Sequence, residues 1–371
     1  MGTRLPTPLT PPFIMTAPCK TLVLGASYGS LLATKLLLAG HSARLICLPA
    51  EVELIEREGM RVRMPIKGRE ALVEVDSRRL PGQLSASSPS GVDPAGFDLV
   101  ALAMQEPQYR SKGVRELLQR VAEARVPCIS IMNMPPLPYL PRIPGIDAAA
   151  CRNCYTDATV WDAFDPAMMT LCSPDPQAGR PADAGANVLQ VRLPTNFKAA
   201  RFESESHTAL LRRLAAEIEA ARYDTGTEQI NLPVKLKVHD SLFVPLAKWA
   251  MLVAGNYRCI TAQGMRPIRD AVHSDIETSR RVYSWVVELC KTLGAADADM
   301  VPFEKYAAAA QSLPAPSSAA RALFGGAPNI ERVDRLVQAI AAQKGQRLRE
   351  LDDVVALVDA KLEANRAAAT P

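Results

Sequence analysis

The chain has 371 residues, which is more than a single hydrophobic core usually supports, so two domains are expected. Its 43 basic and 39 acidic residues give a net charge of only +4, and no basic run is interleaved with aromatic residues. This balance argues against a nucleic-acid partner and leaves a small molecule as the expected partner. No stretch approaches the ~20 apolar residues that a membrane-spanning helix needs, so no membrane partner is expected.

The N-terminal segment 1–18 carries five prolines and lacks the apolar core of a secretory signal. We expect a disordered, proline-rich extension there, with Met15 as an alternative start. The eight cysteines occur singly except for Cys151 and Cys154, which form one CxxC pair. One such pair is a weak zinc signal, so no metal is expected, and scattered free thiols favour a reducing, cytoplasmic setting.

Residues 19–198 alternate between strand and helix patterns, which predicts a doubly wound, mostly parallel sheet of the Rossmann type. A Ser/Pro/Gly-rich stretch, 81–96, is expected to be a surface loop, and the five prolines of 135–144 an extended one. The expected strands cover 20–24, 43–47, 61–64, 71–75, 98–104, 128–132, 169–172 and 188–193. The expected helices cover 29–39, 51–58, 114–124 and roughly 153–164.

From Ser206 onward the apolar residues recur at helical spacing. We therefore expect an all-helical C-terminal domain over 199–371, which would supply the substrate-binding and catalytic residues. The expected helices cover 208–222, 244–253, 270–292, 302–311, 331–343 and 347–365.

A short glycine-containing turn joins the first strand to the first helix. A dinucleotide-binding loop at this position needs glycines for a tight turn, for approach of the pyrophosphate and for helix–strand packing. The helix that follows would add amide donors for the phosphate. This copy reads G-x-x-x-G, one residue shorter than the usual pattern, and its alternative interpretation is a plain tight turn. The turn comprises Gly25, Ala26, Ser27, Tyr28, Gly29 and Ser30.

The end of the second strand usually contacts the adenosine ribose, with an acidic residue for NAD and a basic one for NADP. The segment 46–51 has no arginine, and Glu51 comes late, inside the expected next helix. A carboxylate at a helix N-terminus explains Glu51 equally well. The residues alone therefore leave the choice between the two cofactors open.

Lys248 and Asn256 are the only polar side chains of a long apolar run, 245–256. A spacing of eight places them close to one face of a helix, two turns apart. A lysine held in a cleft beside a carbonyl can donate a proton, and burial would tune its pKa for that task. The alternative is a lysine at the edge of a core helix, with Asn256 as a helix cap.

Taken together, these segments resemble the ketopantoate reductase family along nearly the whole chain. Residues 22–41 (LVLGASYGSLLATKLLLAGH) are similar to its opening strand, loop and helix, and 98–108 (DLVALAMQEPQ) to its "DLVIVAVKAxQ" segment. The stretch 129–133 resembles the strand before its "QNG". Lys248 and Asn256 match its "WxKLxxNxxxN" helix. Further resemblance lies in 276–277 with 292–295, in Ser317 and Ser318, and in Glu331.

The resemblance implies a Rossmann-type domain followed by a helical one, in an enzyme that reduces a small 2-oxo acid with NADP(H), NAD not being excluded. It makes Lys248 the general acid. Asn256, Ser318 and Glu277 would bind the substrate, although Glu277 could instead pair with the arginines of its own helix. Gln105, Asn133 and Glu331 would join the glycine turn in holding the cofactor. A homodimer is possible for helical domains of this kind.

Several positions depart from the family pattern. The glycine turn is one residue shorter, no arginine stands near Pro49, and Gln105 replaces a cofactor-contacting lysine. The "NG" pair has become Asn133-Met134, and Leu252 replaces the first asparagine of the helix. These changes leave two alternatives: an opine- or imine-type reductase on the same scaffold, and a relative that binds a nucleotide without catalysis.

Overall fold

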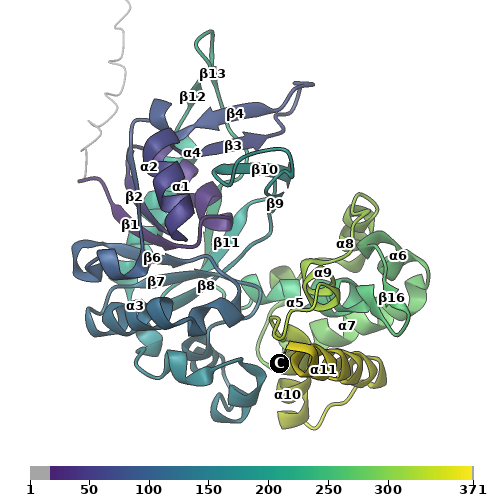
Figure 1. Ribbon diagram of the computed structural model, residues 1–371. Coiled ribbons are helices and arrows are strands. Elements are labelled where there is room, and N and C mark those ends of the chain that lie inside the picture. Colours follow the sequence, from purple (N-terminus) through teal and green to yellow (C-terminus); the bar gives the residue numbers. More distant parts are fainter. Residues whose placement is uncertain (1–16, 370–371) are drawn as a thin grey trace, which may run out of the picture.

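The computed structural model describes residues 17–369, so the expected proline-rich extension lies almost entirely outside the described residues. A large sheet flanked by helices forms the first part of the chain, and a helical region stands beside it (Figure 1). This arrangement confirms the predicted fold class. Within residues 17–369, no helix is both long and apolar enough to cross a membrane.

The main sheet has eight strands in the order β14-β11-β8-β7-β6-β1-β2-β5. All neighbouring strands run parallel except β8 and β11, which are antiparallel. The chain builds from β1 toward β5 on one side and then from β6 toward β8 on the other, so the order reverses between β1 and β6. The strands are β1 Lys20–Leu24, β2 Ser42–Ile46, β5 Gln83–Ser87, β6 Leu99–Leu102, β7 Cys128–Ile131, β8 Met169–Ser173, β11 Phe197–Ala200 and β14 Leu236–His239.

Such a reversal opens a crevice at the carboxyl ends of the two central strands, where open α/β sheets bind their ligands. One buried cluster fills the space between the sheet and helices α1 and α4. The other covers the opposite face and continues into the helical region, from Val100 to Trp249 and Val286. The two parts therefore share one continuous buried core.

Several expectations about local structure were wrong. The presumed surface loop 81–96 contains β5, a half-buried edge strand whose polar residues hide its strand character. The sheet also continues past residue 198, because the four-residue strand β14 pairs with β11. Residues 153–164 form 3₁₀ turns rather than one helix, η6 Ala149–Cys154 and η7 Ala158–Trp161, the second of which is capped by the Asp157 carboxylate.

A smaller four-stranded sheet, in the order β4-β3-β10-β9, lies next to α1 and α2 (Figure 1). It comprises β3 Arg61–Met64, β4 Val73–Asp76, β9 Gln177–Gly179 and β10 Val188–Leu193. Two short hairpins complete the strands, β12 Tyr223–Asp224 with β13 Gln229–Ile230, and β15 Ile260–Thr261 with β16 Gly264–Met265.

The helices α1 Tyr28–Leu38, α2 Pro49–Glu58, α3 Lys112–Glu123 and α4 Glu205–Ala220 flank the sheets. The expected helix 270–292 is divided in two, because the Asp275 carboxylate caps the second part. The helical region comprises α5 Lys248–Met251, α6 Ile268–His273, α7 Ile276–Thr292, α8 Phe303–Ala310, α9 Ser318–Phe324, α10 Val333–Gln343 and α11 Arg349–Ala369.

Candidate functional site

The glycine turn between β1 and α1 is built for close approach of the backbone. Gly25 has a φ of +105°, and a Cβ there would lie 2.7 Å from the Met104 Cγ and 2.8 Å from the Ala103 carbonyl oxygen. A Cβ on Gly29 would lie 2.5 Å from the Val23 Cγ1. The two glycines thus perform two of the three tasks of a dinucleotide loop, the tight turn and the close helix–strand contact.

Ser27 stands where the remaining glycine of that pattern would be. It precedes α1, and its side chain makes no capping hydrogen bond, so its hydroxyl is available to a phosphate. Burial raises the pKa of the Tyr28 hydroxyl. The Ser30 hydroxyl donates back to the Ala26 carbonyl, 2.5 Å away. The turn and the N-terminus of α1 therefore keep the tight backbone and the helix start that a pyrophosphate-binding loop requires.

A narrow cavity, with a free volume of about 20 Å³, lies between the carboxyl edge of the sheet and the helical region. Five residues predicted for the site line it, although they come from five separate segments of the chain: Gln105, Asn133, Asn256, Ser318 and Glu331. The other lining residues are Leu252, Tyr257, Ala319, Ile330 and Val333.

Asn133 and Glu331 meet inside this cavity. The Asn133 amide nitrogen donates to the Glu331 carboxyl group at 3.2 Å, and the Glu106 backbone amide donates to its other oxygen at 3.3 Å. Within the described residues, the buried Asn133 Oδ1 has no hydrogen-bond partner. Because an unpaired buried acceptor is costly, this oxygen marks a position for an N–H or O–H group of a ligand.

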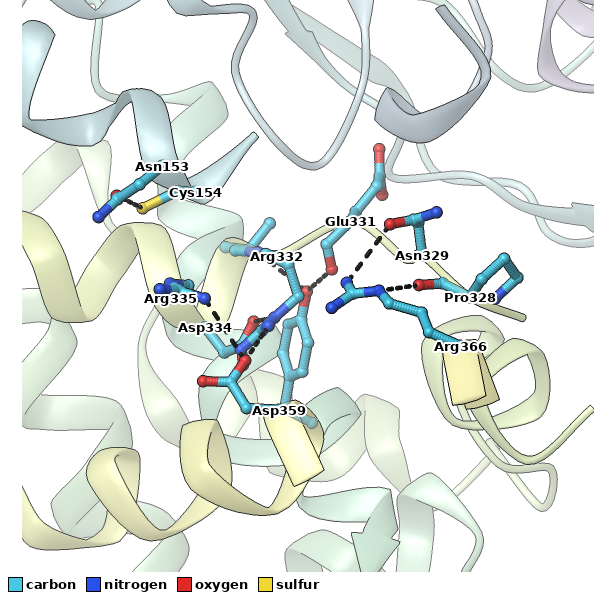
Figure 2. Close-up of polar contacts among 12 residues, drawn as sticks. Asn153, Cys154, Pro328, Asn329, Glu331, Arg332, Asp334, Arg335, Asp359 and Arg366 are labelled. Carbon is cyan, nitrogen blue, oxygen red and sulfur yellow. Dashed lines mark hydrogen bonds and ion pairs between the residues drawn. The ribbon is translucent and has the colours of Figure 1, made fainter. Parts of the chain in front are cut away.

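Glu331 is only 9% exposed, and burial raises its pKa to about 7 against the opposing hydrogen bond from Asn133. Its carboxyl group points away from the ion pairs that Arg332 makes with Asp334 and Asp359 (Figure 2). Those pairs fix the backbone just before α10. The Tyr257 hydroxyl holds the same segment, donating to the Glu331 carbonyl and accepting from the Val333 amide.

Lys248 is the first residue of α5, and its side chain is 13% exposed. Its Nζ donates to the Pro174 carbonyl at 2.6 Å and lies 3.6 Å from the Asp175 Oδ1. Burial lowers the pKa of Lys248, while the negative charges of Asp175 and Glu331 oppose that shift. An ammonium group carries three protons, so these two neighbours leave at least one for a further acceptor.

The helix that begins at Lys248 widens into a π-helical turn, η10 Leu252–Asn256. Hydrogen bonds in such a turn span five residues, so each residue rotates the chain less than in an α-helix. The widening brings Asn256 closer to the face that carries Lys248 than a straight helix would. Turns of this kind are rare and occur frequently at functional sites.

Glu277 is exposed in the first turn of α7 and is not among the residues that line the cavity. The structure therefore does not bring this predicted substrate ligand into the site. The acidic group beside Lys248 is Asp175, which the sequence analysis did not identify. Its position directly after the buried strand β8, between two prolines, is the signal that could have identified it.

An arginine from a distant segment also lies near the end of β2, although the stretch 46–51 that follows the strand contains none. Arg180, which follows β9, forms an ion pair with Glu51 in the first turn of α2. Burial raises the pKa of Cys47 to about 12, with Glu51 adding to the shift and Arg180 opposing it, so both charges lie near the end of this strand. Acidic and basic side chains thus stand together where the ribose of a dinucleotide is usually bound.

The sequence matches no protein-family model and no curated protein. Among solved structures, a ketopantoate reductase from Ralstonia eutropha is 18% identical, with 94% of this chain and 99% of that one covered at a TM-score of 0.60. D-mandelate dehydrogenase, in a ternary structure with NADH and anilino(oxo)acetate, is 15% identical, with the same coverage and a TM-score of 0.61. A dimeric ketopantoate reductase from Staphylococcus aureus is 11% identical, with 93% of this chain and 99% of that one covered at a TM-score of 0.58. These likenesses confirm the fold that the sequence resemblance predicts.

Proposed function

We propose that this protein is a reductase that uses a nicotinamide dinucleotide to reduce the carbonyl of a 2-oxo acid. The observation that carries the proposal is that Lys248, a largely buried cation, lies on the same helical segment as Asn256. Asn256 lines the cavity at the carboxyl edge of the sheet. Burial lowers the pKa of this lysine, which makes its ammonium group a better proton donor. The glycine turn at the same edge fits the cofactor's pyrophosphate.

Each group has a task in this proposal. The bound cofactor would supply the hydride. Lys248 holds a proton at Nζ and gives it to the substrate oxygen, which becomes the hydroxyl of the product. The Asn256 amide and the Ser318 hydroxyl hydrogen bond to the substrate carboxylate. Asn133 offers its unpaired Oδ1 to a donor of the nicotinamide end or of the substrate.

The proposed cofactor is NADP(H). Arg180 would bind the phosphate on the 2′ oxygen of the ribose, because a guanidinium group pairs well with phosphate. Its present partner, Glu51, could instead accept hydrogen bonds from the ribose hydroxyls of NAD(H). The two side chains therefore favour opposite forms of the cofactor.

The proposed substrate carries an apolar side chain. Leu252, Ile330 and Val333 form an apolar part of the cavity wall, and Leu252 occupies a position where the ketopantoate reductase pattern has asparagine. The fold is shared with a D-mandelate dehydrogenase, whose structure holds anilino(oxo)acetate. A second candidate is reduction of an imine, since the unpaired Asn133 oxygen could accept from a substrate N–H.

Turnover of a panel of 2-oxo acids, followed by the absorbance of the reduced cofactor, tests this proposal. Lys248→Ala is expected to lower kcat by at least about a hundredfold, the lower end for loss of a general acid, while NADPH still binds. Lys35→Met is the matched control, because Lys35 is also buried and also donates to backbone carbonyls, those of Leu232 and Pro233. Wild-type kcat in Lys248→Ala would exclude the proposed acid.

The protein is further proposed to form a homodimer in the cytoplasm. The Staphylococcus aureus relative of the same fold is dimeric, and all eight cysteines of this chain are free thiols, as a reducing compartment requires. Light scattering coupled to size-exclusion chromatography would give twice the chain mass for a dimer.

A further inference from the structure

One carboxylate joins two lysines, one of which, Lys248, begins the helix whose next turn lines the cavity. Asp175 places its Oδ2 2.9 Å from the Lys198 Nζ and its Oδ1 3.6 Å from the Lys248 Nζ. The Ser173 hydroxyl donates to the same carboxylate. The side chains of Lys248, Asp175 and Lys198 are 13%, 16% and 31% exposed, so exposure increases from Lys248 to Lys198. These three residues are called the Lys–Asp–Lys row below.

The sheet holds this row in place. β8 and β11 run antiparallel with Ser173 opposite Lys198, so the lysine side chain emerges beside the end of β8. Asp175 follows between Pro174 and Pro176, whose rings restrict the backbone on both sides of it. The Pro174 carbonyl also accepts from Lys248, so one short segment contacts the amine twice.

The charges along the row act against one another. Burial opposes ionisation of Asp175, but Lys248 and Lys198 outweigh it and hold the pKa of this carboxyl group below its usual range. Burial lowers the pKa of Lys248. The negative charges of Asp175 and Glu331 oppose that shift, and the positive charge of Lys198 adds to it.

Three further titratable groups lie near the row. Burial raises the pKa of the Cys172 thiol and of the Tyr28 hydroxyl near Asp175, so both stay uncharged. Burial lowers the pKa of His239, and the positive charge of Lys198 adds to that shift.

We propose that Asp175 and Lys198 are positioning residues that set the proton affinity of Lys248 in opposite directions. Asp175 holds the amine as an ammonium group, and Lys198 competes for the same carboxylate and weakens that hold. In each cycle Lys248 would give one proton to the substrate oxygen, become neutral and regain a proton from water. The inference rests on the proposed function only for the destination of that proton.

Competitive labelling with acetic anhydride tests the row without cofactor or substrate. Only a neutral amine reacts, so acetylation of the Lys248 peptide, followed by mass spectrometry across a pH series, gives the titration midpoint of this lysine. The variants are Asp175→Asn, Lys198→Gln and Asp175→Glu. Asp240→Asn is the matched control, because Asp240 is 81% exposed and pairs with Arg212 rather than with a lysine of the row.

Asp175→Asn is expected to lower the Lys248 midpoint by about one to two pH units, the size of effect of an opposite charge at this distance. Lys198→Gln should raise the midpoint, Asp175→Glu should restore it, and Asp240→Asn should leave it unchanged. An unchanged midpoint in Asp175→Asn overturns the inference. If Asp175→Asn does not fold, Lys198→Gln serves as the test, because this variant keeps the Lys248–Asp175 contact. An unchanged or lowered Lys248 midpoint in Lys198→Gln then overturns the inference.

Turnover separates this inference from the proposed function. The rate should fall as pH rises through the Lys248 midpoint, and that limb should move to lower pH in Asp175→Asn and to higher pH in Lys198→Gln. If the labelling midpoints shift as expected but no oxo acid is reduced, the proposed function fails and the row stands. If reduction occurs but the midpoints stay fixed, the row fails alone.

Discussion

The Tyr306 hydroxyl donates to the Met251 carbonyl at 3.0 Å. Met251 is the last residue of α5, the helix that begins at Lys248. Gly255 leaves the room for the hydroxyl, since a Cβ there would lie only 1.9 Å from the tyrosine oxygen. In a regular helix the Met251 carbonyl would accept from the Gly255 amide. An inserted hydroxyl is a known cause of local distortion, and the chain widens into the π turn that ends at Asn256.

Tyr306→Phe should release the Met251 carbonyl to the regular helical bond and rotate Asn256 away from Lys248. We expect kcat/KM to fall at least about tenfold, because one misplaced substrate contact can cost up to about a hundredfold. The free energy of unfolding should fall by only about 0.5–1.5 kcal/mol, the usual net contribution of one hydrogen bond. Steady-state kinetics and urea denaturation measure the two effects.

Tyr283→Phe is the matched control for that variant. Its hydroxyl donates to the Val301 carbonyl at 2.7 Å, and its ring stacks on Tyr306 with centroids 5.4 Å apart. It should lose similar stability and keep full turnover. Equal losses of turnover in both variants would mean that the π turn is not the cause.

Arg180→Gln should weaken NADPH binding roughly tenfold to a hundredfold, since hydrogen bonds to charged groups contribute about 1.5–3 kcal/mol. NADH binding should stay the same or improve, because Glu51 becomes free to accept from the ribose. Fluorescence titration with each cofactor measures both constants. The control is Arg63→Gln, which breaks the Arg63–Glu74 pair, because the Arg63 side chain is 33% exposed and that of Arg180 is 36% exposed. Equal changes for the two cofactors would rule out a phosphate contact.

Glu331 should make the protein less stable as pH rises toward neutrality. Burial raises its pKa from 4.5 to about 7, so between these values the folded protein binds more protons than the unfolded chain. The free energy of unfolding therefore decreases across this range, by ~3 kcal/mol at most, and is level above it. Denaturation at pH 5 and pH 8 should show a smaller difference in Glu331→Gln than in the wild type.

The exposed residue Glu363 of α11 supplies the control for that measurement, and Glu363→Gln should keep the wild-type difference between the two pH values. A Glu331→Gln protein with an unaltered pH dependence would show that the buried carboxyl group does not titrate in this range.

Gly25→Ala should abolish dinucleotide binding, because the new methyl group would meet the Ala103 carbonyl at 2.8 Å and distort the turn. Gly40→Ala is the comparison, since Gly40 also has a positive φ, +86°, but open space around it. Gly40→Ala should lose only about 1–2 kcal/mol through backbone strain and still bind the cofactor. Thermal melts and calorimetric titration compare the two, and normal affinity in Gly25→Ala would contradict the assigned role of the turn.

The sequence predicts those parts of the site that lie at the ends of regular elements. Gly25 and Gly29 follow a clear strand, Asn133 follows another, and Asn256 shares an apolar helix with Lys248. Apolar periodicity reveals such elements because the buried faces repeat at fixed spacing.

The residues that the sequence did not predict act through contacts between distant segments. Asp175 and Arg180 lie in a proline-containing stretch without periodicity, yet they reach Lys248 and Glu51. The Tyr306 hydroxyl, which bonds to the Met251 carbonyl just before the π turn, comes from α8, far along the chain. Such contacts follow from tertiary packing, which no local pattern encodes.

Calorimetric titration of NADPH, and then NADH, into the full chain tests most directly whether the shortened glycine turn holds a dinucleotide. We expect saturable binding at one site per chain, with a micromolar Kd for NADPH and weaker binding of NADH. Absence of binding heat for both cofactors, in a protein shown to be folded, would contradict the proposed reductase and leave only its fold.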